Sequence, residues 1–237
     1  MGYKSILTLV TSPDLDRSAL SSAITRARTD DAHLDVLCLG IDHTQTGYYY
    51  AGANALLLQE TLKQAQDQAA EVEAAVEKRL EGEDIRWATE TAVAQITGLS
   101  DLVAQRARFA DLVVIHHPYG ETRGIADEAA VEAALFDGKA PLLIPADGQE
   151  MPADFRRVVV GWNNSVEALT AIRAALPILR RAETVSIAII DPPRHGPDHS
   201  DPGTPLSRML SRHGVSAEIT VLARTLPRIS DVIERHV

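Results

Sequence analysis

Apolar runs of strand length recur through the first part of the chain and alternate with segments of helical periodicity. The runs span residues 5–10, 34–40, 85–93, 111–117 and 141–146. Several are apolar almost throughout, as strands buried on both faces of a parallel sheet tend to be. The clearest helical segment repeats apolar residues every three or four positions from Leu58 to Leu80. Further helices are expected to start near Asp16, Ser100 and Asp127. This alternation predicts βαβ units, a parallel sheet and right-handed crossovers.

The same order of elements restarts after a polar segment that contains Gly148 and Pro152. We expect a first domain at 1–147, a linker at 148–155 and a second domain at 156–237. The second domain is predicted to contain strands at 157–162, 184–190 and 217–223, and helices at 165–182, 206–214 and 228–237. Asn164 and Glu167 have the spacing of a capping box at the start of its first helix.

The two halves match in order up to a helix that begins with Ser-Asp, at Ser100 in the first and at Ser230 in the second. By this register the second half has nothing corresponding to about residues 108–147, so it lacks its last two strands. The loss would leave a sheet edge unpaired, which natural domains avoid. We therefore expect either further residues beyond Val237 or strands supplied by a partner.

The composition is acidic, with 33 Asp and Glu against 23 Lys and Arg. This argues against nucleic acid as a partner, because phosphate neutralisation dominates such binding, and against an anionic membrane surface. The single cysteine, Cys38, excludes a disulfide framework. No signal peptide and no apolar stretch of about 20 residues is found. The sequence therefore predicts a cytoplasmic protein.

The loops that follow the strands carry the candidate chemistry. Neither a dinucleotide fingerprint nor a P-loop is present. His116 and His117 are adjacent at a strand end and point to opposite faces, which favours structural or solvated roles over a shared metal. In the loop after strand two of the second half, Asp191, His195, Asp198 and His199 offer a metal site, although a mobile loop is the favoured interpretation.

Other polar and aromatic residues have simpler explanations. Ser12, Ser100 and Ser165 precede predicted helices, where capping explains them without catalysis. The three tyrosines at 48–50 fit stacking on a base, an oligomer contact or plain packing. No pair of carboxylates is distinguished as acid and base. The residues alone nominate no active site and no metal site.

The openings of the two halves, "KSILTLVTSP" and "RRVVVGWNNSVEALTAIRAALPILRRAETV", resemble those of the universal stress protein family. The segment "FADLVVIHHPYG" lies where that family has its fourth strand and phosphate loop. The resemblance covers essentially the whole chain. It implies two tandem open parallel five-stranded α/β sandwiches of Rossmann-like, adenine-nucleotide α-hydrolase-like fold, the second incomplete. It also implies dimers and, in one subgroup, ATP or AMP bound without fast chemistry.

The chain departs from the family's nucleotide motif. Nucleotide-binding members carry an acidic residue after strand one and G-x2-G-x9-G-[ST] after strand four, where glycines let backbone N–H groups approach the phosphates. Here the strand-one positions are Thr11 and Asn163, and the fourth-strand motif keeps Gly120 but reads His117 and Ala130-Val131 elsewhere. Thr11, Ile41, Gly120 and Gly124 are thus the degenerate counterparts of a site in the first domain. In the second domain the resemblance implies Asn163, Asn164, Ser165 and Asp191 as the nucleotide-binding candidates.

Three functions follow from this comparison. The first is a non-catalytic stress-response binding or signalling module that acts as a homodimer. The second is a module that binds ATP or AMP in its second domain and hydrolyses it slowly at most. The third and least favoured is an adenylyl-transfer enzyme, because it requires a phosphate motif that is not found.

Overall fold

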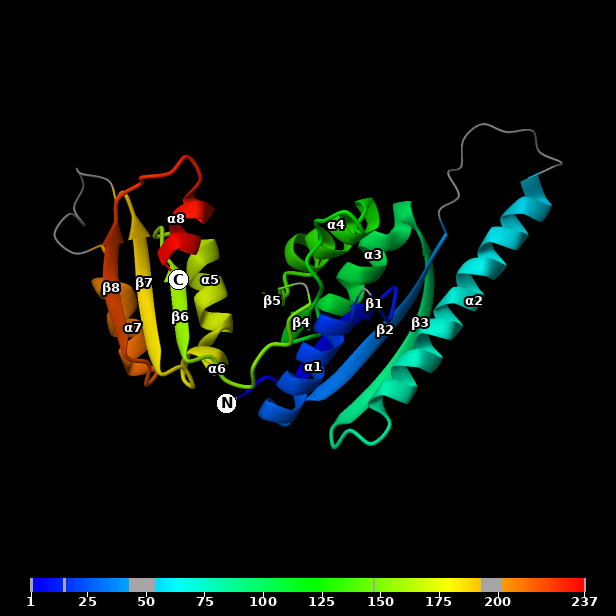
Figure 1. Cartoon of the computed structure of the whole chain (residues 1–237), viewed down its shortest axis with the longest axis horizontal. Helices are drawn as coiled ribbons and strands as arrows, with labels where there is room; N and C mark the ends of the chain where they lie inside the picture. Colours follow the sequence, from blue (N-terminus) through cyan, green and yellow to red (C-terminus); the bar gives the residue numbers. More distant parts are fainter. Residues whose placement is uncertain (1, 15, 43–53, 147, 193–201, 237) are drawn as a thin grey trace. The chain divides into compact units, whose positions relative to one another are not determined.

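The computed structural model describes residues 2–14, 16–42, 54–146, 148–192 and 202–236, with the side chains of 54–58 excepted. The chain divides into two compact units, Met1–Ala153 and Asp154–Val237. Figure 1 shows the elements of both. The segment expected as a linker lies largely in the first unit and contacts its first helix. The backbone N–H of Met151 donates to Ser22 Oγ (3.3 Å), and Arg26 donates to the carbonyl of Ala153 (2.7 Å).

The first unit is a parallel five-stranded sheet in the order β3-β2-β1-β4-β5. Its strands are β1 (Ser5–Val10), β2 (His33–Asp42), β3 (Arg86–Gln95), β4 (Leu112–Val114) and β5 (Leu142–Leu143). Its helices are α1 (Arg17–Asp30), α2 (Asn54–Leu80), α3 (Ile96–Ala107), α4 (Ile125–Glu132) and the π-helical continuation η1 (Ala133–Asp137). The parallel α/β prediction is confirmed. The run at 111–117 forms only three residues of strand, and the last hydrogen bond to β5 is donated by Ile115 to the carbonyl of Leu143 (3.1 Å).

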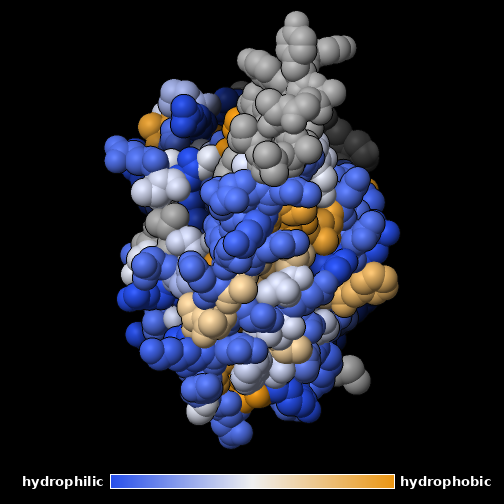
Figure 2. Space-filling view, turned by 90° about the vertical axis from the view of Figure 1, so that its right-hand side faces the viewer, coloured by the Kyte–Doolittle hydropathy of each residue, from blue (hydrophilic) through white to orange (hydrophobic). Residues whose placement is uncertain are grey.

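Helices cover both faces of this sheet. On one face α1 and α2 pack on β1 and β2, and α2 turns Ala65, Ala69, Val72, Val76 and Leu80 inward at the spacing expected from the sequence. On the other face α3, α4 and η1 close a core that includes Leu9, Leu39 and Ile115. Figure 2 looks onto the side that carries α2, where hydrophilic side chains dominate.

One glycine sets the approach of α2 to the sheet. A Cβ added to Gly40 of β2 would lie 1.8 Å from the carbonyl oxygen of Ala65 in α2. Any side chain at this position would push the helix off the strand, so glycine is required here for close packing.

The second unit is a parallel three-stranded sheet in the order β6-β7-β8. Its elements are β6 (Arg157–Gly161), α5 (Val166–Ala174), α6 (Leu176–Leu179), β7 (Thr184–Ile190), α7 (Thr204–Arg212), β8 (Ala217–Leu222) and α8 (Ile229–His236). The core lies between the sheet and α5–α7 and centres on Ile187, Leu206 and Leu210. The order of strands and helices is the one predicted from the sequence, except that the single helix expected at 165–182 divides into α5 and α6.

Candidate functional site

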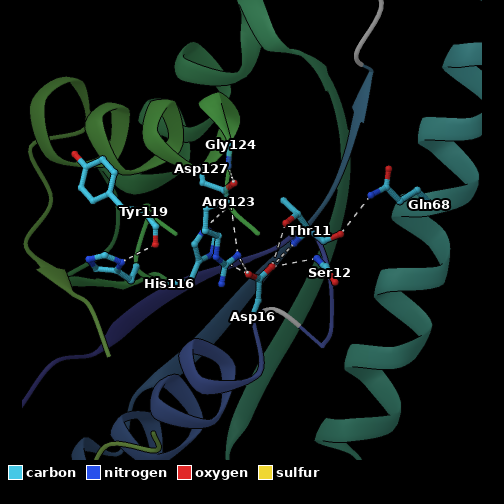
Figure 3. Close-up of polar contacts among 10 residues, drawn as sticks. Thr11, Ser12, Asp16, Gln68, His116, Tyr119, Arg123, Gly124 and Asp127 are labelled. Atoms are coloured by element: carbon cyan, nitrogen blue, oxygen red, sulfur yellow. Dashed lines mark hydrogen bonds and ion pairs between the residues drawn. The ribbon is translucent and has the colours of Figure 1, made fainter. Parts of the chain in front are cut away.

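The strand order of the first unit reverses between β1 and β4, so a ligand crevice is expected beyond their carboxyl ends. Two loops meet there, one joining β1 to α1 and the other joining β4 to α4. Figure 3 shows that the side chains of Asp16, His116, Arg123 and Asp127 converge at this point. We call these four residues the switch-point network.

Asp16 organises the loop after β1. One of its carboxylate oxygens, Oδ2, accepts the backbone N–H groups of Thr11 (2.8 Å) and Ser12 (3.1 Å) and the hydroxyl of Thr11 (3.1 Å). The loop therefore folds around the carboxylate, which is fully buried just before the first turn of α1. A negative charge at this end of a helix is favourable.

The other oxygen of Asp16 faces the side chains of His116 and Arg123. His116 Nδ1 lies 2.9 Å from Oδ1, and Arg123 Nη1 lies 2.8 Å from it. On its far side, His116 Nε2 lies 2.7 Å from Asp127 Oδ1, and Arg123 is 3.5 Å from the same atom. Asp127 also accepts the backbone N–H of Gly124 (2.7 Å) at the start of α4. The network thus joins the starts of α1 and α4 to the loop after β4.

Burial and the neighbouring charges shift the pKa values of these groups in opposite directions. Burial disfavours the charged form of Asp16, but hydrogen bonds and charge from His116 and Arg123 outweigh it and hold the pKa well below its usual range. The pKa of Asp127 is lowered by His116 and Gly124 against the same burial penalty. Burial likewise opposes protonation of His116, yet its two carboxylate partners raise its pKa above the ordinary value. The shifts of all three groups favour the state in which the two carboxylates are ionised and His116 is protonated.

Little space remains at this crevice among the described residues. The cavity there has a volume of ≈ 10 Å³, about enough for one water. Apolar side chains line it together with His116 and Asp127; they include Leu9, Leu39, Ile41 and Leu99. A larger groove of ≈ 330 Å³ lies over β1–β3 beside the end of α3, where Glu90 pairs with Arg106. Its lining residues on β1 are Ser5 and Leu7, in the first half of the strand. The groove therefore lies away from the carboxyl ends of the strands.

The predicted residues of the first unit lie in or beside the switch-point network. The amide and hydroxyl of Thr11 are both directed to Asp16, and its carbonyl accepts from Gln68 (3.4 Å). Ile41 lines the small cavity, and Gly124 precedes α4 with extended backbone. Gly120 has a φ of 142°, a conformation that favours glycine.

The switch-point network itself is not predicted by the sequence. The sequence pattern marks Asp16 and Asp127 only as helix starts and does not mark Arg123. The sequence did contain one signal, since an acidic residue expected after strand one is absent at Thr11 but present five positions later. His116 is buried and His117 exposed, as their predicted opposite orientation requires.

The candidates of the second unit form a polar turn at the carboxyl end of β6. Asn163 Oδ1 accepts the N–H of Ser165 (3.1 Å), and Ser165 Oγ accepts the N–H of Ala168 (3.1 Å). Ser165 is therefore the N-cap of α5, and the capping box predicted at Asn164 is wrong by one residue. Asn164 instead adopts a left-handed φ of 61°.

Asp191 follows the neighbouring strand β7 at the same edge of this sheet. Its backbone N–H donates to the carbonyl of Leu222 (3.0 Å), and its φ is 46°. Asn163, Asn164 and Asp191 are all exposed. The carboxyl edge of this unit is thus polar and accessible at these positions, unlike that of the first.

The remaining candidates lie outside the described residues. They are the tyrosines at 48–50 and His195, Asp198 and His199. Within the part of the chain that the structure describes, no group of three or more His, Cys, Asp or Glu residues is arranged to hold a metal. In that same part, every helix is too short or too polar to cross a membrane.

No protein-family model matches the chain, and no curated protein matches it by sequence. Several solved structures do match the chain. A universal stress protein from Archaeoglobus fulgidus DSM 4304 matches with a TM-score of 0.71 at 13% identity, over 98% of this chain and 81% of that one. The chain has the fold of universal stress proteins.

Two further structures carry the same family name. A putative universal stress protein from Pseudomonas aeruginosa UCBPP-PA14 matches with a TM-score of 0.50 at 17% identity, over 93% of this chain and 74% of that one. A universal stress protein in complex with cAMP covers 62% of this chain and 100% of its own, at 18% identity. Its TM-score of 0.34 is too low to bear on ligands here.

Proposed function

We propose that this chain is a non-catalytic binding or signalling module of the universal stress type, which acts in the cytoplasm as a homodimer. The observation that carries the proposal is the switch-point network. Asp16, His116 and Arg123 fill the crevice where an α/β sheet of this order binds its ligands. Among the described residues of the first unit this crevice is nearly filled, which favours interaction over turnover.

The same network argues against catalysis at this point. A general acid or base needs a proton within reach of a substrate atom. Asp16, Asp127 and His116 are instead committed to one another, and the space beside them holds about one water. Breaking these pairs to admit a substrate would leave buried charges uncompensated, which is costly.

A second candidate function is the binding of ATP or AMP by the second unit, with slow hydrolysis at most. The exposed turn at Asn163 and Asn164 leads directly into the N-terminus of α5, and Asp191 lies at the same sheet edge. Helix N-termini favour anionic groups such as phosphates. This candidate places any nucleotide in the second unit and none in the first.

The test is photoaffinity labelling of the full chain with 8-azido-ATP, followed by peptide mapping. We expect no label on the loops at 11–16 and 115–124. If the second candidate holds, label appears near Asn163 and falls in Asn163→Leu but not in Gln64→Leu, a matched loss of an exposed amide in the first unit. Label on the first-unit loops would contradict both candidates. Sedimentation equilibrium tests the homodimer separately.

A further inference from the structure

The groove of ≈ 330 Å³ in the first unit lies over the first halves of β1, β2 and β3. Alternate residues of these strands form its floor; they are Ser5, Leu7, Asp35, Leu37, Ala88 and Glu90. Leu7 and Leu37 also belong to the core under α3, so the groove opens on that side of the sheet. Ala88 is exposed, which shows that the described helices leave this part of the sheet open. Sites for small molecules have volumes of about 300 Å³ and more, so the groove is large enough for one.

The charged side chains that line the groove leave one negative charge in excess, because two are carboxylates and one is a guanidinium. The guanidinium is committed to one of the carboxylates. Arg106 Nε donates to Glu90 Oε2 (2.9 Å), and its second hydrogen bond reaches Glu90 Oε1. A fork of this kind is among the strongest and most directional ion pairs. Arg106 therefore offers little to an anionic ligand.

The second carboxylate, that of Asp35, is open to a ligand. Among the described residues its ion-pair partner is His33, whose Nε2 lies 3.4 Å from Asp35 Oδ1. The Asp35 side chain is 50% exposed. A carboxylate that lies in a partly apolar groove and still reaches solvent can accept hydrogen bonds from a cation. The charge of the groove thus favours a cationic ligand over an anionic one.

An aromatic ring stands beside this carboxylate. Phe109 lines the groove and is 81% exposed. Its backbone N–H donates to the carbonyl of Arg106 (3.3 Å), which ties the residue to the end of α3. A single exposed apolar side chain needs no explanation by itself. The face of an aromatic ring attracts cations, however, and here the ring shares a groove with an accessible carboxylate.

We infer that this groove binds a small organic cation with an apolar body, of the arylalkylammonium class. The ammonium group pairs with Asp35 and faces the ring of Phe109, and the apolar body lies on Leu7 and Ala88. The groove is separate from the switch-point network and from the candidate nucleotide residues of the second unit. The inference therefore goes beyond the proposed function.

The test is a titration of the intact chain with phenethylammonium, followed by the NMR shifts of its backbone amides. We expect saturable shifts confined to the residues that line the groove. Phenethyl alcohol has the same ring without the charge and should bind more weakly. Phenylacetate, an anion, should bind more weakly still. Added salt should weaken the binding of phenethylammonium, because the Asp35 side chain is half-exposed.

Two substitutions separate the contributions of charge and ring. Asp35→Asn keeps the shape of the side chain and should weaken phenethylammonium binding at least about threefold, with loss of the preference over phenethyl alcohol. Phe109→Leu keeps an apolar side chain and should weaken binding about two- to fivefold. Asp137→Asn and Phe136→Leu are the matched controls. They change exposed residues of η1 that do not line the groove, and they should leave binding unchanged.

Four results would overturn the inference: no saturation at millimolar phenethylammonium, shifts centred elsewhere, equal binding of the alcohol or the anion, or a groove variant that binds as tightly as its control. The variants should retain the amide spectrum of the wild type outside the groove, since both side chains are largely exposed. Labelling by 8-azido-ATP does not involve these residues. Failure here is therefore distinguishable from failure of the proposed function.

Discussion

The two units begin with the same β-α-β-α-β-α order but bury their first elements to very different extents. Five of the six residues of β1 are buried, against one of five in β6. α1 buries ten residues, whereas α5 buries only Ile172. The difference follows from β4, which flanks β1 and has no counterpart beside β6 among the described residues. The first strand of a unit and the helix after it become core only where the sheet extends on both sides of that strand.

The carboxyl edges differ for the same reason. In the first unit, β4 brings His116 to Asp16, and the loops that meet there desolvate the charges. Buried charges must then be paired. In the second unit the corresponding turn is exposed, and Asn163 and Ser165 are satisfied by local backbone N–H groups. A buried ionic network is therefore a consequence of the complete sheet.

Removing the centre of the switch-point network should have the largest effect. Asp16→Ala leaves His116 and Arg123 buried without their shared partner, and we expect a loss of about 3–5 kcal/mol in the free energy of unfolding of the first unit. Urea titration followed by unit-resolved hydrogen exchange measures it. The second unit should be unchanged.

The matched control is Asp14→Ala, which removes an exposed carboxylate from the same loop. It should change the free energy of unfolding by less than about 0.5 kcal/mol. Equal effects of the two substitutions would show that the network contributes nothing beyond surface charge.

Truncating equivalent apolar residues compares the first strands of the two units, β1 and β6, directly. Ile6 and Val158 are each the second residue of their strand and pair with Leu34 and Val185. Ile6 is fully buried, so Ile6→Ala should cost about 2–5 kcal/mol in the first unit. Val158 is half-buried, and Val158→Ala should cost less than about 1 kcal/mol in the second unit.

The same unit-resolved exchange measurement serves for both substitutions. A large cost of Val158→Ala would mean that β6 is covered on its second side.

The sequence predicts the order of elements well because the signals are local. Residues 5–10 and 184–190 were assigned as strands with the bounds that the structure gives. The strand expected at 111–117 is longer than β4, which covers only Leu112–Val114, although Ile115 still donates to the carbonyl of Leu143 (3.1 Å). At Asn164 two capping residues compete, and only backbone geometry decides for Ser165.

The site could not be predicted in the same way. Asp16 and Arg123 are separated by 107 residues, and each resembles an ordinary helix-start or surface residue. Only the pairing of β1 with β4 brings them together. A contact between residues so far apart in the sequence leaves no local pattern. The sequence therefore shows that the nucleotide motif is degenerate, but not that an ionic network takes its place.

The smallest expected effect is a pH dependence confined to the first unit. The raised pKa of His116 means that its contribution to stability is complete below the unfolded value of about 6.5 and is lost as the pH rises through the folded value. The lowered pKa values of Asp16 and Asp127 mean that their contribution is present above about 4 and is lost as the pH falls. The first unit should therefore be most stable between about pH 4 and 6.5.

Urea midpoints measured across this range for the wild type and His116→Gln test the assignment. In the variant, the stability of the first unit should no longer fall as the pH rises. It should still fall as the pH is lowered, because Arg123 still faces Asp16. The other histidines are common to both chains, so their contributions cancel in the difference. If the alkaline decline persisted in the variant, His116 would not be the protonated partner of the two carboxylates, and the balance of charge at the switch point would have to rest on Arg123 alone.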